Sequence, residues 1–156
     1  MESPPKCLLL PIDGTAESLR PIEFIVQLYP GARDVNLILC YFTPPPPPGF
    51  SGAAKESPDV LKKRRDFIAS REQTTRRIFE DAKRTLLEAG FSRETIQEHV
   101  QQKQMTVAKH ACLLADTKQV DAIRVQKRVS SSLEGFLKGD SPSTLLQHCM
   151  GSPIWF

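Results

Sequence analysis

Cysteine is sparse in this 156-residue chain, and its four copies stand far apart. They are Cys7, Cys40, Cys112 and Cys149, with no C-x-x-C pair and no histidine at a metal-ligand spacing. Structural zinc sites use closely spaced Cys and His pairs, and small secreted scaffolds use denser cysteine patterns. The sequence therefore argues against a zinc module, and we expect reduced, mostly buried thiols.

Long hydrophobic runs are also missing. The first apolar run, CLLLPI at 7–12, is too short for the core of a signal peptide and ends at Asp13-Gly14. No run approaches the ~20 apolar residues of a membrane span. We therefore expect a cytoplasmic protein that makes no contact with a membrane.

An excess of one charge is absent as well. The chain has 21 basic and 18 acidic residues, so its net charge of +3 implies no extended polyanion-binding surface. The one dense basic run, KKRR at 62–65, has no aromatic residues interleaved with it. Such a run is typical of a solvated helix face, and we expect no nucleic-acid partner.

Catalytic constellations are not recognisable. His99, His110 and His148 lie on different predicted elements, without a nearby nucleophile elbow or a paired acid at a recognisable spacing. Each is interpreted as a surface or partly satisfied histidine, and the serine run 130–132 as a flexible loop. The sequence thus names no catalytic or metal-ligating residue, and we expect a protein that is not an enzyme.

What the sequence does contain is an alternation of apolar runs and helical stripes. Two continuously apolar runs, 7–12 and 35–42, read as strands buried on both faces. Between them, the stripe over 16–28 predicts a helix, with Pro21 in or near its first turn and Pro30-Gly31 after its end. This strand-helix-strand order is the signature of a right-handed parallel unit.

The later elements are predicted in the same way. Residues 58–89 form one long helix that ends at Gly90, although its polar centre, ASREQTTRR, favours an exposed or irregular middle. The remaining expected elements are a strand at 95–100, a helix at 106–117, a strand at 120–125, a helix starting at Ser141-Pro142 and a closing strand at 152–156.

The Pro-rich loop at 43–52, TPPPPPGFSG, cannot join a strand ladder or a helix, because each proline fixes φ and removes a donor. It is predicted to run as an extended, stiff surface segment. A ligand for a proline-recognising domain is the alternative.

These elements predict a single domain over residues 1–156, a three-layer α/β/α sandwich with a mainly parallel five-stranded sheet. Open sheets of this kind bind ligands outside the carboxyl ends of their strands, at the point where the strand order reverses. Here that point lies between the strands at 7–12 and 120–125, beside Asp13 and Gln126.

The segments LLLPIDGTAES, VDAIRV, GDSPSTLLQH and SPI, taken in this order, resemble a universal stress protein domain of the UspA type. The resemblance covers nearly the whole chain. It implies the Rossmann-like, HUP-type fold of adenine-nucleotide α-hydrolases, with the strand order 3-2-1-4-5. It also implies a role in a stress response.

Nucleotide-binding members of this family carry the motif G-x2-G-x9-G-[ST] after the fourth strand. Laid on this chain without a gap, the motif falls on Gln126, Val129, Gly139 and Asp140, so one glycine of three is kept. The resemblance implies adenine contacts at Asp13 and near Tyr41. The candidate cofactor-binding positions are Asp13, Tyr41, Gln126, Arg128, Val129, Gly139, Asp140 and Ser141.

The altered loop is predicted not to hold ATP. A cradle of backbone N–H groups needs glycine where φ is positive, and the β-branched Val129 resists that geometry. Asp140 stands at a predicted helix start, where its carboxylate can accept hydrogen bonds from the N–H groups that a phosphate would otherwise use. We therefore expect no cofactor. The alternative is an ATP binder with Mg, or a slow ATPase, in which Lys127, Arg128 and Lys138 supply charge in place of the lost contacts.

The chain's last strand carries Trp155 at the edge of the predicted sheet, and an uncovered edge favours pairing with a second copy. We expect a homodimer through this strand and an unidentified protein partner. Trp155 and Phe156 folding back on the protein's own helices is the alternative. A further alternative is that the chain is a subunit or one half of a larger tandem protein.

Overall fold

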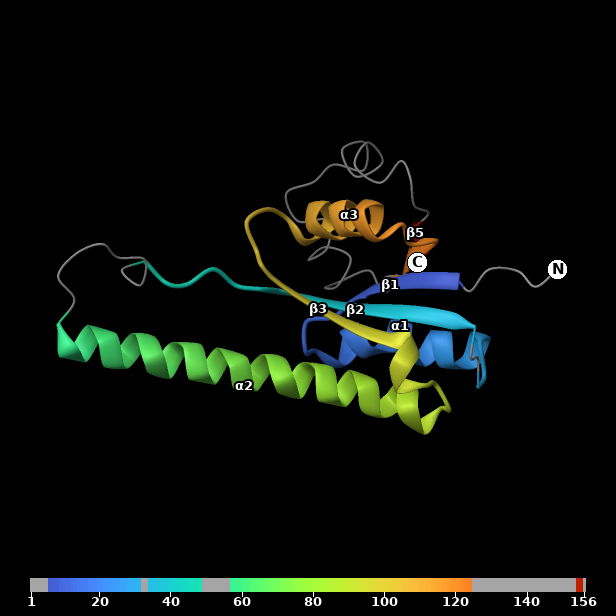
Figure 1. The fold of residues 1–156 in the computed structure, drawn as a ribbon, viewed down its shortest axis with the longest axis horizontal. Coiled ribbons are helices and arrows are strands. Elements are labelled where there is room, and N and C mark those ends of the chain that lie inside the picture. Colours follow the sequence, from blue (N-terminus) through green and yellow to red (C-terminus); the bar gives the residue numbers. More distant parts are fainter. Residues whose placement is uncertain (1–5, 32–33, 49–56, 125–153, 156) are drawn as a thin grey trace.

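The computed structural model describes residues 6–31, 34–48, 57–124 and 154–155 (Figure 1). Its elements are β1 (Lys6–Pro11), α1 (Ala16–Leu28), β2 (Val35–Thr43), α2 (Pro58–Glu88), the 3-10 turn η1 (Arg93–Thr95), β3 (Ile96–Gln102), α3 (Val107–Lys118), β4 (Ala122–Arg124) and β5 (Ile154–Trp155). The helix expected after Ser141-Pro142 lies outside the described residues.

The five strands form one sheet in the order β3-β2-β1-β4-β5. Every neighbouring pair is parallel, and β1 lies between β2 and β4. The predicted order and the adjacency of the first and fourth strands are confirmed. Within the described part of the chain β4 has three residues, shorter than the predicted 120–125.

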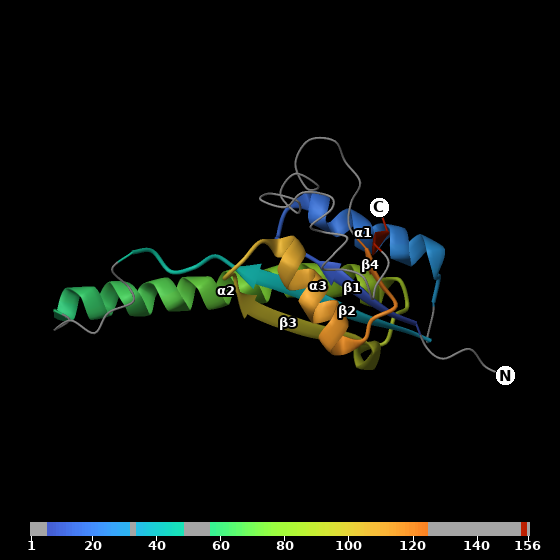
Figure 2. The same ribbon diagram turned by 90° about the horizontal axis from the view of Figure 1, so that it is seen from above.

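The sheet is covered on both faces, with α1 and α2 on one side and α3 on the other (Figures 1 and 2). Because successive side chains of a strand point to opposite faces, the apolar run of β1 contributes to two cores. Leu8 and Leu10 join the core under α1 and α2, whereas Leu9 joins the core under α3. All three are fully buried, which explains why this strand has no polar alternation.

Helix α1 begins at a Thr15 cap whose side chain accepts from the backbone N–H of Ser18. Pro21 is buried and is the sixth residue of the helix, so it lies near the first turn but beyond the positions whose N–H has no partner within the helix. At that position a residue would donate to the carbonyl of Glu17, so the proline removes one helix bond. The helix continues because Ile22 and Ile25 anchor it to the core.

Helix α2 is continuous over 31 residues, and Gly90 follows its end with φ +95°. Its buried residues all lie in the second half, whereas the first half projects beyond the sheet (Figure 1). The polar centre is therefore exposed but regular. After β2, residues 44–48 form neither helix nor strand, as the prolines predict, and Arg71 of α2 donates to Thr43 Oγ1 and to the carbonyl of Pro44.

The cysteines differ in state. Cys7 and Cys40 are free, and Cys40 is fully buried. Cys112, on the buried face of α3, is disulfide-bonded, so the expectation of a reduced thiol is wrong at this position. Sequence spacing could not show this, because it does not tell which distant side chains the fold brings together. Cys149 lies outside the described residues.

None of the helices in the described ranges combines the length and the apolar character needed to cross a bilayer.

His110 of α3 is buried, with 3% of its surface exposed, and not a surface side chain. Its Nε2 accepts from the backbone N–H groups of Gln104 (2.9 Å) and Met105 (3.2 Å), and its ring stacks on Phe42 at 4.9 Å. The neutral imidazole thus holds the turn between β3 and α3. His99 on β3 is partly buried, and His148 lies outside the described residues.

We expect this contact to make stability depend on pH. Burial, and to a lesser extent Lys103, lowers the pKa of His110 below its usual value. The unfolded chain then binds more protons than the folded chain as the pH falls from about 7 to about 5, so the free energy of unfolding should fall with it. His110→Gln keeps an acceptor without titrating, and should flatten the profile measured by urea unfolding. Equal pH slopes for both proteins would contradict this role.

Candidate functional site

The carboxyl ends of β1 and β2 bring two of the candidate residues together. Asp13 follows β1 by two residues, and Tyr41 lies in the last part of β2. The strands are parallel and in register, so both residues reach the same edge of the sheet. The carboxylate of Asp13 is near enough to raise the pKa of the Tyr41 phenol.

Asp13 is already engaged in the turn that starts α1. Its Oδ1 accepts from the backbone N–H of Thr15 (2.8 Å) and from the Thr15 hydroxyl (2.6 Å). The backbone N–H of Asp13 donates to Ser18 Oγ at 3.2 Å, and the Ser18 N–H donates to Thr15 Oγ1 at 3.3 Å. These bonds satisfy donors that the first helical turn leaves open. Asp13 is thus a turn and cap residue, whatever else it binds.

Tyr41 is half-buried against the core under α1 and α2. Burial is the main cause that raises the pKa of its phenol, Arg71 opposes the shift, and Asp13 adds to it. The phenol therefore keeps its proton at neutral pH. It is a hydrogen-bond donor at the same edge of the sheet as the Asp13 carboxylate.

A small pocket of about 150 Å³ lies between the turn after β1 and helix α2. Its lining residues are Asp13, Gly14, Leu19, Thr74, Arg77, Ile78 and Asp81. Clefts that bury a drug-sized ligand have volumes of roughly 300 Å³ or more. At this end of the sheet the described residues therefore do not enclose a nucleotide by themselves, and the segment after β4 would have to complete such a site.

Six of the eight candidate positions follow β4 in the sequence. Gln126, Arg128, Val129, Gly139, Asp140 and Ser141 lie outside the described residues.

Arg124, at the carboxyl end of β4, is a residue that the sequence analysis missed. It is buried, and its guanidinium carbon lies 4.2 Å from the ring centroid of Phe24 in α1. Burial lowers its pKa, yet an arginine remains charged far above neutral pH. The arginine within the strand sequence VDAIRV could have drawn attention to this position. Arg124 carries a positive charge two residues before the expected phosphate loop.

Within the described ranges no three Cys, His, Asp or Glu side chains converge as metal ligands do.

Residues 6–151 match the sequence model of the universal stress protein family. The chain belongs to the universal stress protein family. This universal stress protein is similar in structure to a family member from Burkholderia pseudomallei, at 17% identity and a TM-score of 0.61, covering 100% of this chain and 98% of that one. It is also similar to a universal stress protein in complex with cAMP, at 22% identity and a TM-score of 0.60, covering 99% of both chains.

A third similar structure is a family protein from Arabidopsis thaliana with AMP bound, at 11% identity and a TM-score of 0.60, covering 97% of this chain and 93% of that one. At these identities the likeness shows the Rossmann-like fold. No curated protein matches the chain.

The turn after β1 can be tested through its glycine. Gly14 has φ +86°, and a Cβ there would lie 2.8 Å from Cγ1 of the buried Ile78. Gly14→Ala should therefore lower the free energy of unfolding by about 2 kcal/mol or more, the sum of a left-handed backbone and overpacking.

Gly31→Ala is the matched control, because Gly31 has φ +66° and nothing within 4 Å of its Cβ position. It should cost only the backbone term, about 1 kcal/mol. Denaturant unfolding measures both variants. Equal losses would show that the turn after β1 does not pack against Ile78 as described.

Proposed function

We propose that this universal stress protein is a non-enzymatic protein of the cytoplasmic stress response that does not bind ATP with useful affinity. It works through dimerisation and through contacts with a partner protein. The observation that carries the proposal is the sequence of the family's phosphate loop, which keeps only one of the three motif glycines. Asp13, the first residue of the family's adenine site, is kept, but its Oδ1 accepts two hydrogen bonds from Thr15, so the turn alone accounts for its presence.

The residues that replace the motif explain the expected loss of ATP affinity. At the glycine positions of the family motif stand Gln126 and Val129, and at its Ser/Thr position stands Asp140. Side chains there prevent close approach of the backbone to a phosphate, and a carboxylate at a helix start competes with the phosphate for N–H donors. Exposed lysine and arginine pairs contribute typically ~0 to 1 kcal/mol, which does not replace a preformed cradle.

Adenine-nucleotide binding is the second candidate function. The similar structures with cAMP and AMP favour it, as does the position of Asp13 beside Tyr41 at the carboxyl edge of the sheet. In this alternative Lys127, Arg128 and Lys138 attract the phosphates, with Mg, and slow ATP hydrolysis follows.

Calorimetric titration of the full chain with ATP and Mg²⁺ separates the two functions. We expect no binding heat at micromolar protein, because the loop lacks two of the three glycines of the motif. Native mass spectrometry of freshly purified protein should likewise show no retained nucleotide. A micromolar dissociation constant for the unmodified chain would refute the proposal in favour of the alternative.

A gain-of-function variant tests the reason for the loss. Gln126→Gly, Val129→Gly and Asp140→Ser together restore the residue types of the family motif, and the triple variant should gain ATP affinity. Gly139 is already in place. If the triple variant stays silent, the obstacle lies at the Asp13 and Tyr41 end of the site and the loop explanation is wrong.

The dimer is expected to form through β5, which ends the sheet at its edge beside β4. Adding a charge to an edge strand disfavours pairing with a second copy. Light scattering at micromolar concentration should therefore give a dimer mass for the unmodified chain and a monomer mass for Trp155→Glu. A monomer in both cases would exclude this interface and support folding back of the chain end.

A further inference from the structure

The opposite edge of the sheet is formed by β3, a strand of seven residues that pairs with β2 on one side. The backbone N–H of Lys103 donates to the carbonyl of Thr43, so this residue faces β2. Backbone groups alternate in direction along a strand. The N–H and C=O groups of Glu98, Val100 and Gln102 therefore point away from β2, and no other strand in the described ranges pairs with them.

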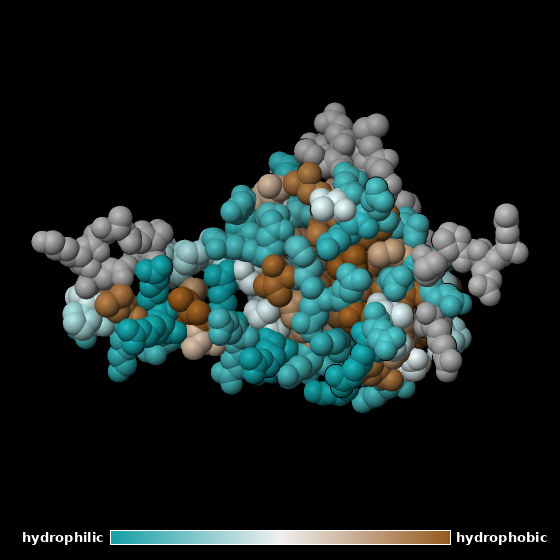
Figure 3. Space-filling view, in the orientation of Figure 1, coloured by the Kyte–Doolittle hydropathy of each residue, from teal (hydrophilic) through white to brown (hydrophobic). Residues whose placement is uncertain are grey.

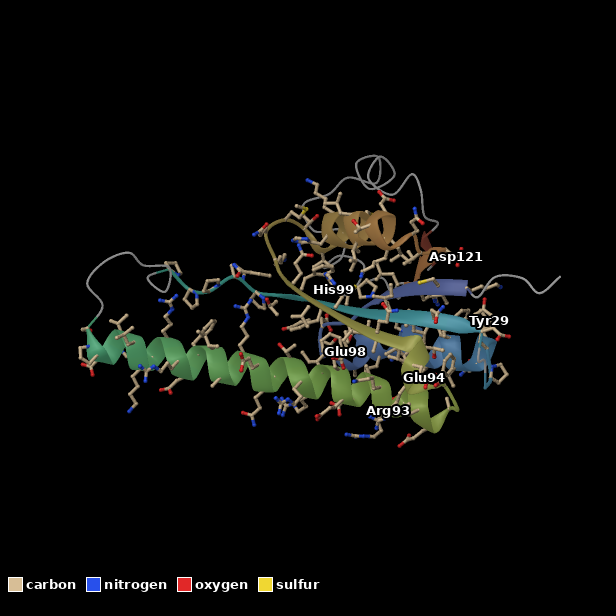
Figure 4. All side chains as sticks on the ribbon, in the orientation of Figure 1. Tyr29, Arg93, Glu94, Glu98, His99 and Asp121 are labelled. Carbon is tan, nitrogen blue, oxygen red and sulfur yellow. The ribbon has the colours of Figure 1, made fainter. Side chains whose placement is uncertain are left out.

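A groove of about 620 Å³ runs along this edge. The side chains of Glu98, Val100 and Gln102 form one wall, and α2 forms the other. Glu98 lies on the α2 side of β3 and His99 on the opposite side (Figure 4). The same three residues thus offer outward backbone groups and groove-lining side chains. Val100, 49% exposed, is the apolar residue of the strand wall.

The groove leads toward the projecting first half of α2, residues 58–71, here named the arm. The arm carries five Lys or Arg residues against two Asp residues. Val60, Leu61 and Ile68 are exposed on it, and Figure 3 shows apolar side chains among hydrophilic ones along this part of the molecule. An apolar and basic surface next to an open strand edge fits a partner that is extended, partly apolar and acidic at one end.

We propose that this groove binds an extended peptide segment of a partner protein. The segment adds a strand to β3, places an apolar side chain over Val100, and lays acidic residues along the arm. This proposal names the partner contact of the proposed function, and it does not depend on whether a nucleotide binds.

A second copy of this chain is the less suitable occupant. Its own β3, IQEHVQQ, carries a single carboxylate, that of Glu98, which already pairs with Lys83 across the groove. It therefore brings no free acidic group to the five basic residues of the arm.

The probe is a display library of peptides about twelve residues long, with Val or Thr at alternate positions and the rest random. At ~3.3 Å per residue such a peptide spans β3 and reaches the arm. The full-length protein is compared with two variants at one position. Val100→Pro removes an outward N–H and leaves the ladder with β2 intact, whereas Val100→Thr keeps the N–H and the strand preference.

Selected peptides should be enriched in Asp and Glu toward one end, and should bind the unmodified protein and Val100→Thr alike. Their affinity for Val100→Pro should fall by at least about tenfold, since a main-chain bond and the approach of the added strand are lost. Gln102→Pro serves in the same role if Val100→Pro does not fold.

Hydrogen exchange gives a readout that needs no variant. The bound peptide should protect the amides of Glu98, Val100 and Gln102, while that of Gln101, which faces β2, should change little. Equal affinity for Val100→Pro, no enriched peptide, or unchanged exchange at the outward amides would overturn the proposal. Self-association that Val100→Pro abolishes would also overturn it, in favour of a second copy.

Discussion

Burial of β1 on both of its faces is the constraint on which this fold depends. Leu8, Leu9 and Leu10 are fully buried, two toward α1 and α2 and one toward α3. A parallel sheet can bury such a strand only when helices cover both sides. Asp121 adds a polar tie at the amino end of the strand (Figure 4), where its carboxylate accepts from the Cys7 N–H at 2.7 Å. Every other strand is placed relative to β1.

The direction of β1 also determines the chemistry at its carboxyl end. Because β1 is parallel to β2 and β4, Asp13 lies at the same edge of the sheet as Tyr41 and the carboxyl end of β4. The same position must turn the chain into α1, and the Asp13-Gly14-Thr15 sequence does this with side-chain hydrogen bonds to Thr15. One residue thus serves the fold and the family's ligand site at once. Its presence therefore cannot by itself distinguish a binding member of the family from a non-binding one.

Helix α2 is longer than the sheet that it covers. Its second half packs Ile78, Phe79, Ala82 and Leu86 into the core, whereas no strand of the described residues lies beneath its first half. Arg71 ties the junction to the end of β2 through Thr43 and Pro44. The groove beside β3 lies against residues 71–83 of α2, and the surplus length extends from its end as the exposed arm.

The sequence by itself determined the element order and the two-sided burial of β1, because continuous apolar runs and short turns leave few topologies open. The strand order 3-2-1-4-5 came from the resemblance to universal stress protein domains, and the structure confirms it. The Asp13-Gly14-Thr15 sequence is typical of a turn, and the structure shows Asp13 bonded within that turn. Only the tertiary structure decided which distant groups meet. His110 became a buried acceptor for Gln104 and Met105, and Arg124 a buried cation over Phe24. Periodicity reports which face of an element is apolar, but a contact between elements depends on their packing, which no local pattern encodes.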